Sequence, residues 1–189
     1  MPITSDGSWI NTFTGIAFHP LDPRAEDVSI TDIAHALAYQ CRYTGHTRQF
    51  YSIAEHSVLV AKGVAALGGS LNDQRWGLLH DGSESYVSDI SSPVKKDPRF
   101  SFYREVESRL MLAIAQRFKL EGPEPDVVRF VDAQMIAFES MDERIIMCRN
   151  PNWPVIEQDP RLKDAIKIEC LLPASAENAF MGHYKELFS

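Results

Sequence analysis

Apolar residues recur three or four positions apart along most of this chain, which is the spacing of an amphipathic helix. Ile30, Ile33 and Leu37 illustrate it, because they fall on one stripe that follows Ser29. Serine commonly precedes the first turn of a helix, since its hydroxyl can accept a free backbone N–H. The pattern predicts helices that begin near Ser29, Ser52, Asn72 or Asp73, Pro98, Asp126 and Ser175.

Two of these boundaries carry a more specific signal. Ser52 and Glu55 have the Ser-x-x-Glu spacing of a capping box, in which each side chain binds the backbone N–H of the other residue. Asp126 follows a segment with two prolines, residues 121–125, and is predicted to cap a helix that runs through Glu139. Both signals place helix starts just ahead of apolar runs.

Strands are expected at only two places. Threonines and aromatic residues around Thr14 and Gly15 predict a short hairpin within residues 9–18, and residues 166–172 predict a short strand. The chain shows no internal repeat and no second-domain linker. It is therefore predicted to be one all-α domain, residues 1–189, with a short N-terminal β-hairpin.

Composition narrows the class of protein. The 189 residues are 44% hydrophobic and 24% charged, which is ordinary for a globular chain. Three scattered cysteines, Cys41, Cys148 and Cys170, argue against a disulfide framework and suit the reducing cytoplasm. The polar N-terminus lacks the order of a signal peptide, and no apolar run approaches the roughly 18 to 20 residues that span a bilayer. We expect a cytoplasmic protein with no membrane partner.

The net charge of −7 bears on the partners. An acidic surface without clustered Lys or Arg repels a polyanion, so a nucleic-acid polymer is an unfavourable partner. A small phosphorylated ligand stays compatible with this charge if local cations outweigh it.

The candidate chemistry lies in His56, the adjacent pair His80 and Asp81, and Asp132, which belong to three predicted helices. Two imidazoles and two carboxylates suit a divalent transition metal such as Mn, Fe, Co, Ni or Zn. A lone histidine among apolar residues is more often structural than a ligand. The order of a His, then His-Asp, then Asp, with helical segments between, favours a metal site.

That order resembles the HD-domain superfamily of metal-dependent phosphohydrolases, whose fold is a helical bundle. Residues 80–95 (HDGSESYVSDISSPVK) look like the signature of the YfbR-like 5′-deoxynucleotidases. Residues 32–37, 41–46 and 50–58 resemble a branch found in phages, prophages and bacteria, which includes YfdR-type proteins and phage dATP triphosphohydrolases of the DatZ type. The family pattern has Gly where this chain has Ser88 and Pro where it has Ser91, which concerns the loop and none of the predicted ligands.

The resemblance implies a role for each matching residue. His56, His80, Asp81 and Asp132 would bind the metal ion. Glu84 would orient or deprotonate the attacking water, and Asp89 would donate a proton to the leaving oxygen or support the site. Five further side chains are assigned to the substrate. Arg42 and Lys95 would bind phosphate, with Arg42 also suited to the sugar, and Tyr43 would contact the base or deoxyribose. His46 and Arg48 would contact phosphate or have a structural role.

Three other residues are interpreted from their positions and residue types. Glu139 lies seven residues after Asp132, hence on the same helix face, and is expected to support the site by a hydrogen bond or to form an ordinary salt bridge. Trp76 and Trp153 are expected to be packing anchors.

The resemblance implies hydrolysis of a small-molecule deoxynucleotide at its 5′ phosphorus. A deoxynucleoside monophosphate would give nucleoside and phosphate, and a triphosphate, notably dATP, would give nucleoside and triphosphate. The alternatives are a non-catalytic HD module that binds metal or nucleotide, and a hydrolase of cyclic dinucleotides or alarmones. The resemblance also implies a homo-oligomer, a dimer or larger.

Overall fold

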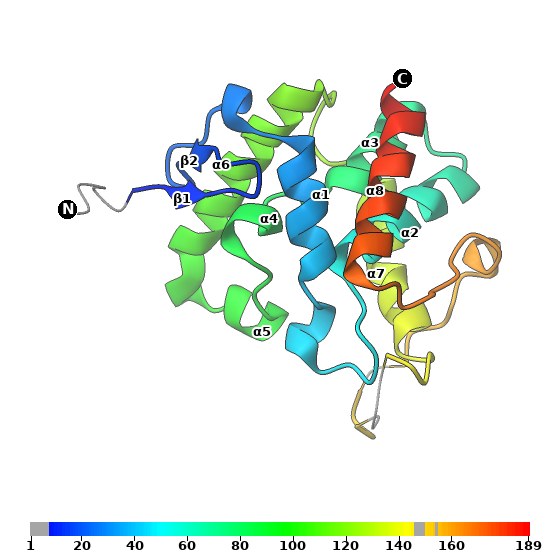
Figure 1. Ribbon diagram of the computed structural model, residues 1–189. Coiled ribbons are helices and arrows are strands. Elements are labelled where there is room, and N and C mark those ends of the chain that lie inside the picture. Colours follow the sequence, from blue (N-terminus) through cyan, green and yellow to red (C-terminus); the bar gives the residue numbers. More distant parts are fainter. Residues whose placement is uncertain (1–7, 146–149, 154) are drawn as a thin grey trace.

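The structure is a computed structural model that describes residues 8–145, 150–153 and 155–189. It is mainly helical, with one small antiparallel sheet beside the helices (Figure 1). In chain order the elements are β1 (Ile10–Asn11), β2 (Ala17–Phe18), η1 (Ala25–Asp27), α1 (Ile30–Tyr39), η2 (Arg42–Gly45), α2 (Ile53–Ala66), α3 (Leu71–Leu79), α4 (Glu84–Val87), α5 (Ser92–Lys95), η3 (Pro98–Phe100), α6 (Ser101–Phe118), α7 (Asp126–Glu139), η4 (Pro160–Leu162) and α8 (Pro173–Phe188).

Helix α2 lies at the centre of the fold and is buried along most of its length. It packs against α1, α3, α7 and α8, so it is covered from several directions (Figure 1). Gly77 of α3 allows a close approach to α2, because a Cβ there would lie 3.0 Å from Cα of Ala61. This central position buries His56 completely.

The N-terminal hairpin is confirmed. Ile10 pairs with Phe18 and Asn11 with Ala17 in antiparallel register. The hairpin is fixed to α1 because the carboxylate of Asp32 accepts two hydrogen bonds from Thr14, at 2.7 Å from the backbone N–H and 2.8 Å from the hydroxyl.

Of the two hydrogen bonds of the capping box expected at Ser52 and Glu55, only the one accepted by Ser52 is present. Ser52 does cap α2, since its hydroxyl accepts the N–H of Glu55 at 3.0 Å. The carboxylate of Glu55 instead accepts three backbone N–H groups, from Glu169, Cys170 and Leu171, at 2.6, 3.1 and 2.7 Å. Within the described chain the predicted strand at residues 166–172 is absent, because Glu55 takes the hydrogen bonds that a neighbouring strand would have made.

Three other helix boundaries differ from the prediction. The reciprocal capping box lies at Ser70 and Asp73, so α3 begins one residue before Asn72. Helix α7 begins at Asp126 with no side-chain cap from Pro125, and α8 begins at Pro173, two residues before the expected start. A proline suits the first turn of a helix because its missing N–H would have had no partner there.

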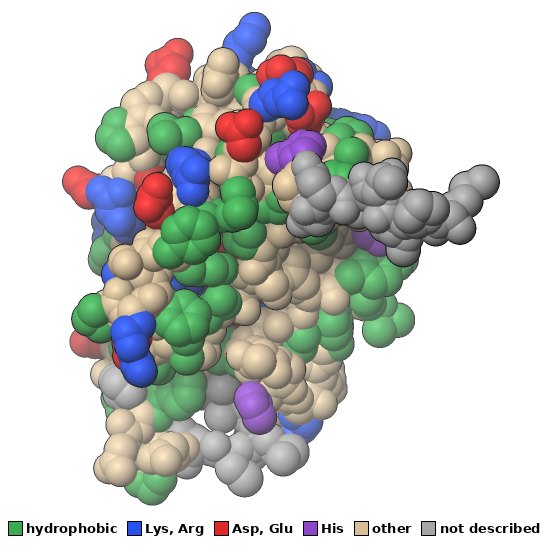
Figure 2. All heavy atoms as spheres, turned by 90° about the vertical axis from the view of Figure 1, so that its left-hand side faces the viewer, with side chains coloured by type: hydrophobic (Ala, Val, Ile, Leu, Met, Phe, Trp, Pro, Cys, Tyr) green, Lys and Arg blue, Asp and Glu red, His purple; other side chains and the backbone are tan. Residues whose placement is uncertain are grey.

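The surface mixes both charge signs. On the face drawn in Figure 2, acidic and basic side chains are interspersed, with hydrophobic side chains between them. Cys41 and Cys170 are free thiols, and Cys148 lies outside the described residues. None of the helices in the described ranges combines the length and apolar character needed to cross a bilayer.

Candidate metal centre

Three helices bring the four predicted ligands together. His56 lies in the first turns of α2, His80 and Asp81 follow the end of α3, and Asp132 lies in the middle of α7. Nε2 of His80 is 3.2 Å from Oδ2 of Asp81, and Nε2 of His56 is 3.6 Å from the same oxygen. One ligand atom from each of these three residues lies within 4.8 Å of the others, so the cluster could hold a metal ion.

Asp132 reaches the same place from α7. Its Oδ1 lies 3.1 Å from Nε2 of His56 and 3.8 Å from Nε2 of His80. The side chain is 45% exposed, whereas the two imidazoles are almost wholly buried. Asp132 therefore forms the wall of the cluster that faces the solvent.

The hydrogen bonds of the two imidazoles fit a metal ion. Nδ1 of His80 donates to the carbonyl oxygen of Gly77 at 2.8 Å, and Nδ1 of His56 lies 3.1 Å from Oε1 of Glu139. Among the described residues neither Nε2 atom has a hydrogen-bond partner, although both are buried. A histidine that donates through Nδ1 presents the lone pair of Nε2, which is the form that binds metal.

Electrostatics keep the carboxylates of the cluster ionised. Burial opposes ionisation of Asp81, but the charge of His80 lowers the pKa of this carboxyl to about 2. The two imidazoles likewise overcome burial and lower the pKa of Asp132. In turn Asp81 raises the pKa of His80 well above its ordinary value, against the opposing effect of burial, so a metal ion that binds Nε2 would displace a proton from it. Ionised carboxylates are the form that a cation requires.

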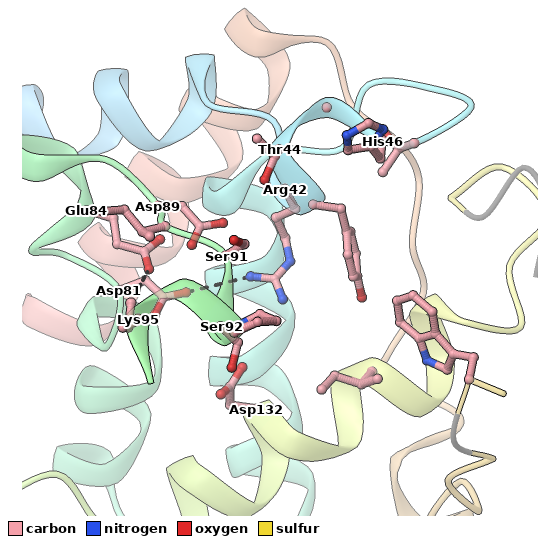
Figure 3. Close-up of a pocket in the computed structure, with 17 residues that line it drawn as sticks. Arg42, Thr44, His46, Asp81, Glu84, Asp89, Ser91, Ser92, Lys95 and Asp132 are labelled. Atoms are coloured by element: carbon pink, nitrogen blue, oxygen red, sulfur yellow. Dashed lines mark ion pairs between the residues drawn. The ribbon is translucent and has the colours of Figure 1, made fainter. Parts of the chain in front are cut away.

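The cluster opens into a pocket of about 960 Å³ (Figure 3). Figure 3 shows the labelled polar side chains of Arg42, Asp81, Glu84 and Asp89 around one space. The lining residues are Arg42, Tyr43, Thr44, Gly45, His46, Thr47, Asp81, Glu84, Asp89, Ile90, Ser91, Ser92, Pro93, Lys95, Asp132, Ile136 and Trp153.

Glu84 lies in this pocket beside a lysine. Nζ of Lys95 is 3.5 Å from Oε1 of Glu84 and 2.7 Å from Oε1 of Glu107. Burial, followed by the charges of Asp81 and Asp89, raises the pKa of Glu84 to about 9. Added positive charge in the pocket would lower this pKa again, so Glu84 is placed where it can exchange a proton with water.

The segment from Glu84 to Asp89, which comprises α4 and the residues after it, is held by Gln40, the residue that follows α1. Nε2 of Gln40 donates to the carbonyl of Glu84 at 3.1 Å, while its Oε1 accepts from the backbone N–H of Asp89 at 3.3 Å. Ser88 between them has φ 68° and ψ 156°, a conformation that is nearly confined to glycine. Ser88 therefore holds a backbone conformation that glycine would adopt without strain.

Arg42 joins the pocket to a buried carboxylate. Its guanidinium lies 3.8 Å from Asp81 and 3.4 Å from Glu139, which is fully buried. Glu139 also accepts the hydroxyl hydrogens of Tyr43 and Tyr51. Burial opposes ionisation of Glu139, but Arg42 and the hydrogen bond with His56 lower its pKa to about 2. The expected hydrogen-bonding support by Glu139 is present, and a salt bridge accompanies it.

Comparison with known proteins places the chain in a family. It is 30% identical over 183 residues to the uncharacterized protein YfdR of Escherichia coli, an alignment that covers 95% of this chain and 96% of that protein. The chain belongs to the YfdR family. It is also 35% identical over 127 residues to an uncharacterized protein of Rhodobacter capsulatus, covering 65% of this chain and 64% of the relative. No family model matches the chain.

In this member of the YfdR family some of the remaining predicted residues lie at the pocket and others do not. His46 lines the pocket, whereas Arg48 is not among the described lining residues and its backbone N–H donates to Ile145. Trp76 is 5% exposed, as expected of a packing anchor. Trp153 is half-buried beside the ring of Tyr43, and it also lines the pocket, which was not expected.

Sequence reasoning also missed Gln40 and Glu107. Neither has a motif spacing that ties it to the site. Gln40 is noticeable only as the polar residue that ends a predicted helix, and Glu107 lies on an otherwise ordinary helix face. Only the folded chain brings them to the loop of Glu84 and to Lys95.

Proposed function

We propose that this chain is a metal-dependent phosphohydrolase of the HD-domain type that acts on 5′-deoxyribonucleotides. It would cleave the bond between the α-phosphorus and the 5′ oxygen. The products would be a deoxynucleoside with phosphate from a monophosphate, or with triphosphate from a substrate such as dATP. The resemblance of residues 80–95 to the deoxynucleotidase signature supports this choice of substrate.

One observation carries the proposal: two buried Nε2 atoms, which have no hydrogen-bond partner among the described residues, face two ionised carboxylates at a large pocket. His56, His80, Asp81 and Asp132 would hold a divalent ion such as Co, Mn, Zn, Fe or Ni. When bound, such an ion acidifies water and polarises a phosphoryl oxygen.

The other pocket residues supply the groups that hydrolysis requires. Glu84 orients the attacking water and accepts its proton, since its carboxyl is buried close to the cluster. Lys95 and Arg42 bring two positive charges to a pocket that must accept phosphate. As the new P–O bond forms, the 5′ oxygen leaves and takes up the proton that the attacking water gave to Glu84, and Asp89, which lines the same pocket, is placed to relay it.

The site also suits the rest of the nucleotide and the setting we propose for it. Tyr43 offers a ring beside Arg42, whose guanidinium carbon lies 5.6 Å from the ring centroid. This pairing provides a flat apolar surface next to a cation, which matches a base or deoxyribose next to a phosphate. We propose a cytoplasmic homo-oligomer, a dimer or larger, as implied by the resemblance.

A substrate panel tests the proposal. Protein purified without chelator would be incubated with Mn or Co and with deoxy- and ribonucleotide mono- and triphosphates, and the products separated by chromatography. We expect release of deoxynucleoside from at least one 5′-deoxynucleotide. An absence of turnover on every 5′-nucleotide would refute it, and turnover of cyclic dinucleotides or alarmones alone would favour the other hydrolase class.

A matched variant separates catalysis from binding. Glu84→Ala should retain nucleotide binding while losing turnover. Glu84 is proposed to accept a proton from water, and it is not one of the four proposed metal ligands. A non-catalytic module would bind nucleotide without turnover in the parent protein, and the substitution would change nothing.

A further inference from the structure

The pocket has two chemically different ends. Asp81 and Asp132 make one end anionic and suited to a cation. The lining continues along α7 to Ile136, which lies one helical turn, about 6 Å, beyond Asp132. Tyr43 and Trp153 complete that second end with two aromatic rings.

The ring of Tyr43 is held in place from two sides. Its hydroxyl donates to the buried carboxylate of Glu139, and its backbone has φ 56°, in the left-handed region that L-residues rarely adopt. Thr44 follows with φ 55° and Gly45 with φ 79°, so the segment turns sharply around the pocket wall. The conformation of Tyr43 is thus fixed by a contact and by the backbone.

Trp153 lies next to this ring, and both residues line the pocket. The two ring centroids lie 6.3 Å apart with an angle of 54° between the planes, so the rings form a wedge and do not stack on each other. A planar ring between two parallel aromatic rings needs about 7 Å, twice the carbon–carbon contact distance. An outward shift of roughly 1 Å and a rotation of one ring would provide that space.

We infer that Trp153 and Tyr43 form a clamp that binds the heteroaromatic base of the substrate and selects 5′-phosphate esters that carry such a base over base-free sugar phosphates. This inference rests on the proposed function and deepens it by naming what the second end of the pocket recognises. Stacking on aromatic side chains tolerates any base, so Trp153 sets the substrate class and leaves the choice among bases to other contacts.

Kinetics on two substrates test the clamp. Deoxyadenosine 5′-phosphate or triphosphate carries a base, and 2-deoxyribose 5-phosphate does not. Trp153→Ala should raise KM for the nucleotide by about 10- to 100-fold with little change in kcat, because one stacking surface is lost. It should leave 2-deoxyribose 5-phosphate unaffected, and Trp153→Phe should recover most of the nucleotide KM. Trp9→Ala is the matched control, since Trp9 is in the N-terminal segment and is not among the lining residues.

A binding measurement separates failure of the clamp from failure of the proposed function. Deoxyadenosine 5′-phosphate should quench tryptophan fluorescence in the parent protein and in Trp9→Phe, but far less in Trp153→Phe. This result without any turnover would support the clamp and refute the hydrolase. Turnover with the same ratio of nucleotide to sugar-phosphate KM in Trp153→Ala, and with unchanged quenching in Trp153→Phe, would overturn the clamp and leave the hydrolase standing.

Discussion

The carboxylate of Glu139 lies 3.1 Å from Nδ1 of His56, and both side chains are completely buried. Glu139 therefore fixes which nitrogen of His56 faces the cluster. The same carboxylate binds Arg42 and Tyr43, so one buried group orients a predicted metal ligand and two predicted substrate residues.

We expect Glu139→Gln to weaken metal binding by about 10- to 100-fold, the usual effect of losing a group that orients a ligating histidine. It should also lower the thermal midpoint, because the buried guanidinium of Arg42 loses its counter-charge. Calorimetric titration with Mn or Co measures the first effect. Glu143→Gln, an exposed glutamate shortly after α7, is the control. Equal affinity in the two variants would contradict the orienting role.

Substitutions of Asp81 and Glu84 should affect metal content differently, although the two residues are only three positions apart. Asp81→Ala removes a ligand atom of the cluster, so the purified protein should contain little metal and show no activity. Glu84→Ala should keep its metal and lose about 100-fold or more of the rate, which is typical of a lost proton-transfer group. Elemental analysis and an assay on the same samples provide the measurement. Full activity in Glu84→Ala would reject its role.

Chelation should destabilise the protein. A ligand at 100 times its dissociation constant stabilises the folded state by about 2.7 kcal/mol, which corresponds to roughly 5 to 10 °C for a chain of this size. Differential scanning fluorimetry should show that loss with EDTA and its recovery with Mn or Co. In Asp81→Ala the midpoint should not respond to EDTA. An equal response in that variant would place the stabilising metal elsewhere.

Ser88→Gly should stabilise the fold. Ser88 has φ 68° and ψ 156°, which costs an L-residue about 1 to 3 kcal/mol, whereas glycine adopts it freely. After loss of the exposed hydrogen bond to Gln40, we expect a gain of about 1 kcal/mol in the free energy of unfolding, measured by urea denaturation. Ser108→Gly, inside α6, should instead lose about 0.5 kcal/mol. A loss at both positions would show that Ser88 is unstrained.

Glu55→Ala should destabilise the protein by about 3 kcal/mol or more. Three backbone N–H groups would lose their charged acceptor, and each such bond contributes about 1.5 to 3 kcal/mol. Hydrogen exchange at residues 169–171 should accelerate. Glu169→Ala, at an exposed position of the same segment, should change the unfolding free energy little. If the three amides exchange at the parent rate in Glu55→Ala, the anchoring role is wrong.

The sequence predicted most of the helices because their burial pattern follows local spacing. The hairpin near Gly15 and the helix capped by Ser29 are confirmed for that reason. The prediction of a strand at residues 166–172 was wrong, because the side chain of Glu55, more than a hundred positions away, accepts the backbone hydrogen bonds of this segment. Nothing in a local pattern reports that carboxylate.

The candidate site also has residues that the sequence predicted and residues that only the folded chain reveals. His56, His80 and Asp81 could be selected from their order along the chain, and the structure brings them together. Trp153 was expected only to be a packing anchor, and its place beside Tyr43 at the pocket follows from the folded chain alone. The roles of Glu84, Asp89 and the substrate residues stay predictions.

Through Gln40, α1 also positions part of the pocket. Its carboxamide ties the backbone of Glu84 and Asp89 to the end of a helix that rests on α2 and α8. Trimming the protein to the stretch from His56 to Asp132 would keep every proposed ligand and still release that loop. The smallest active fragment would need α1, which carries Gln40 at its end, and α8, against which α1 packs.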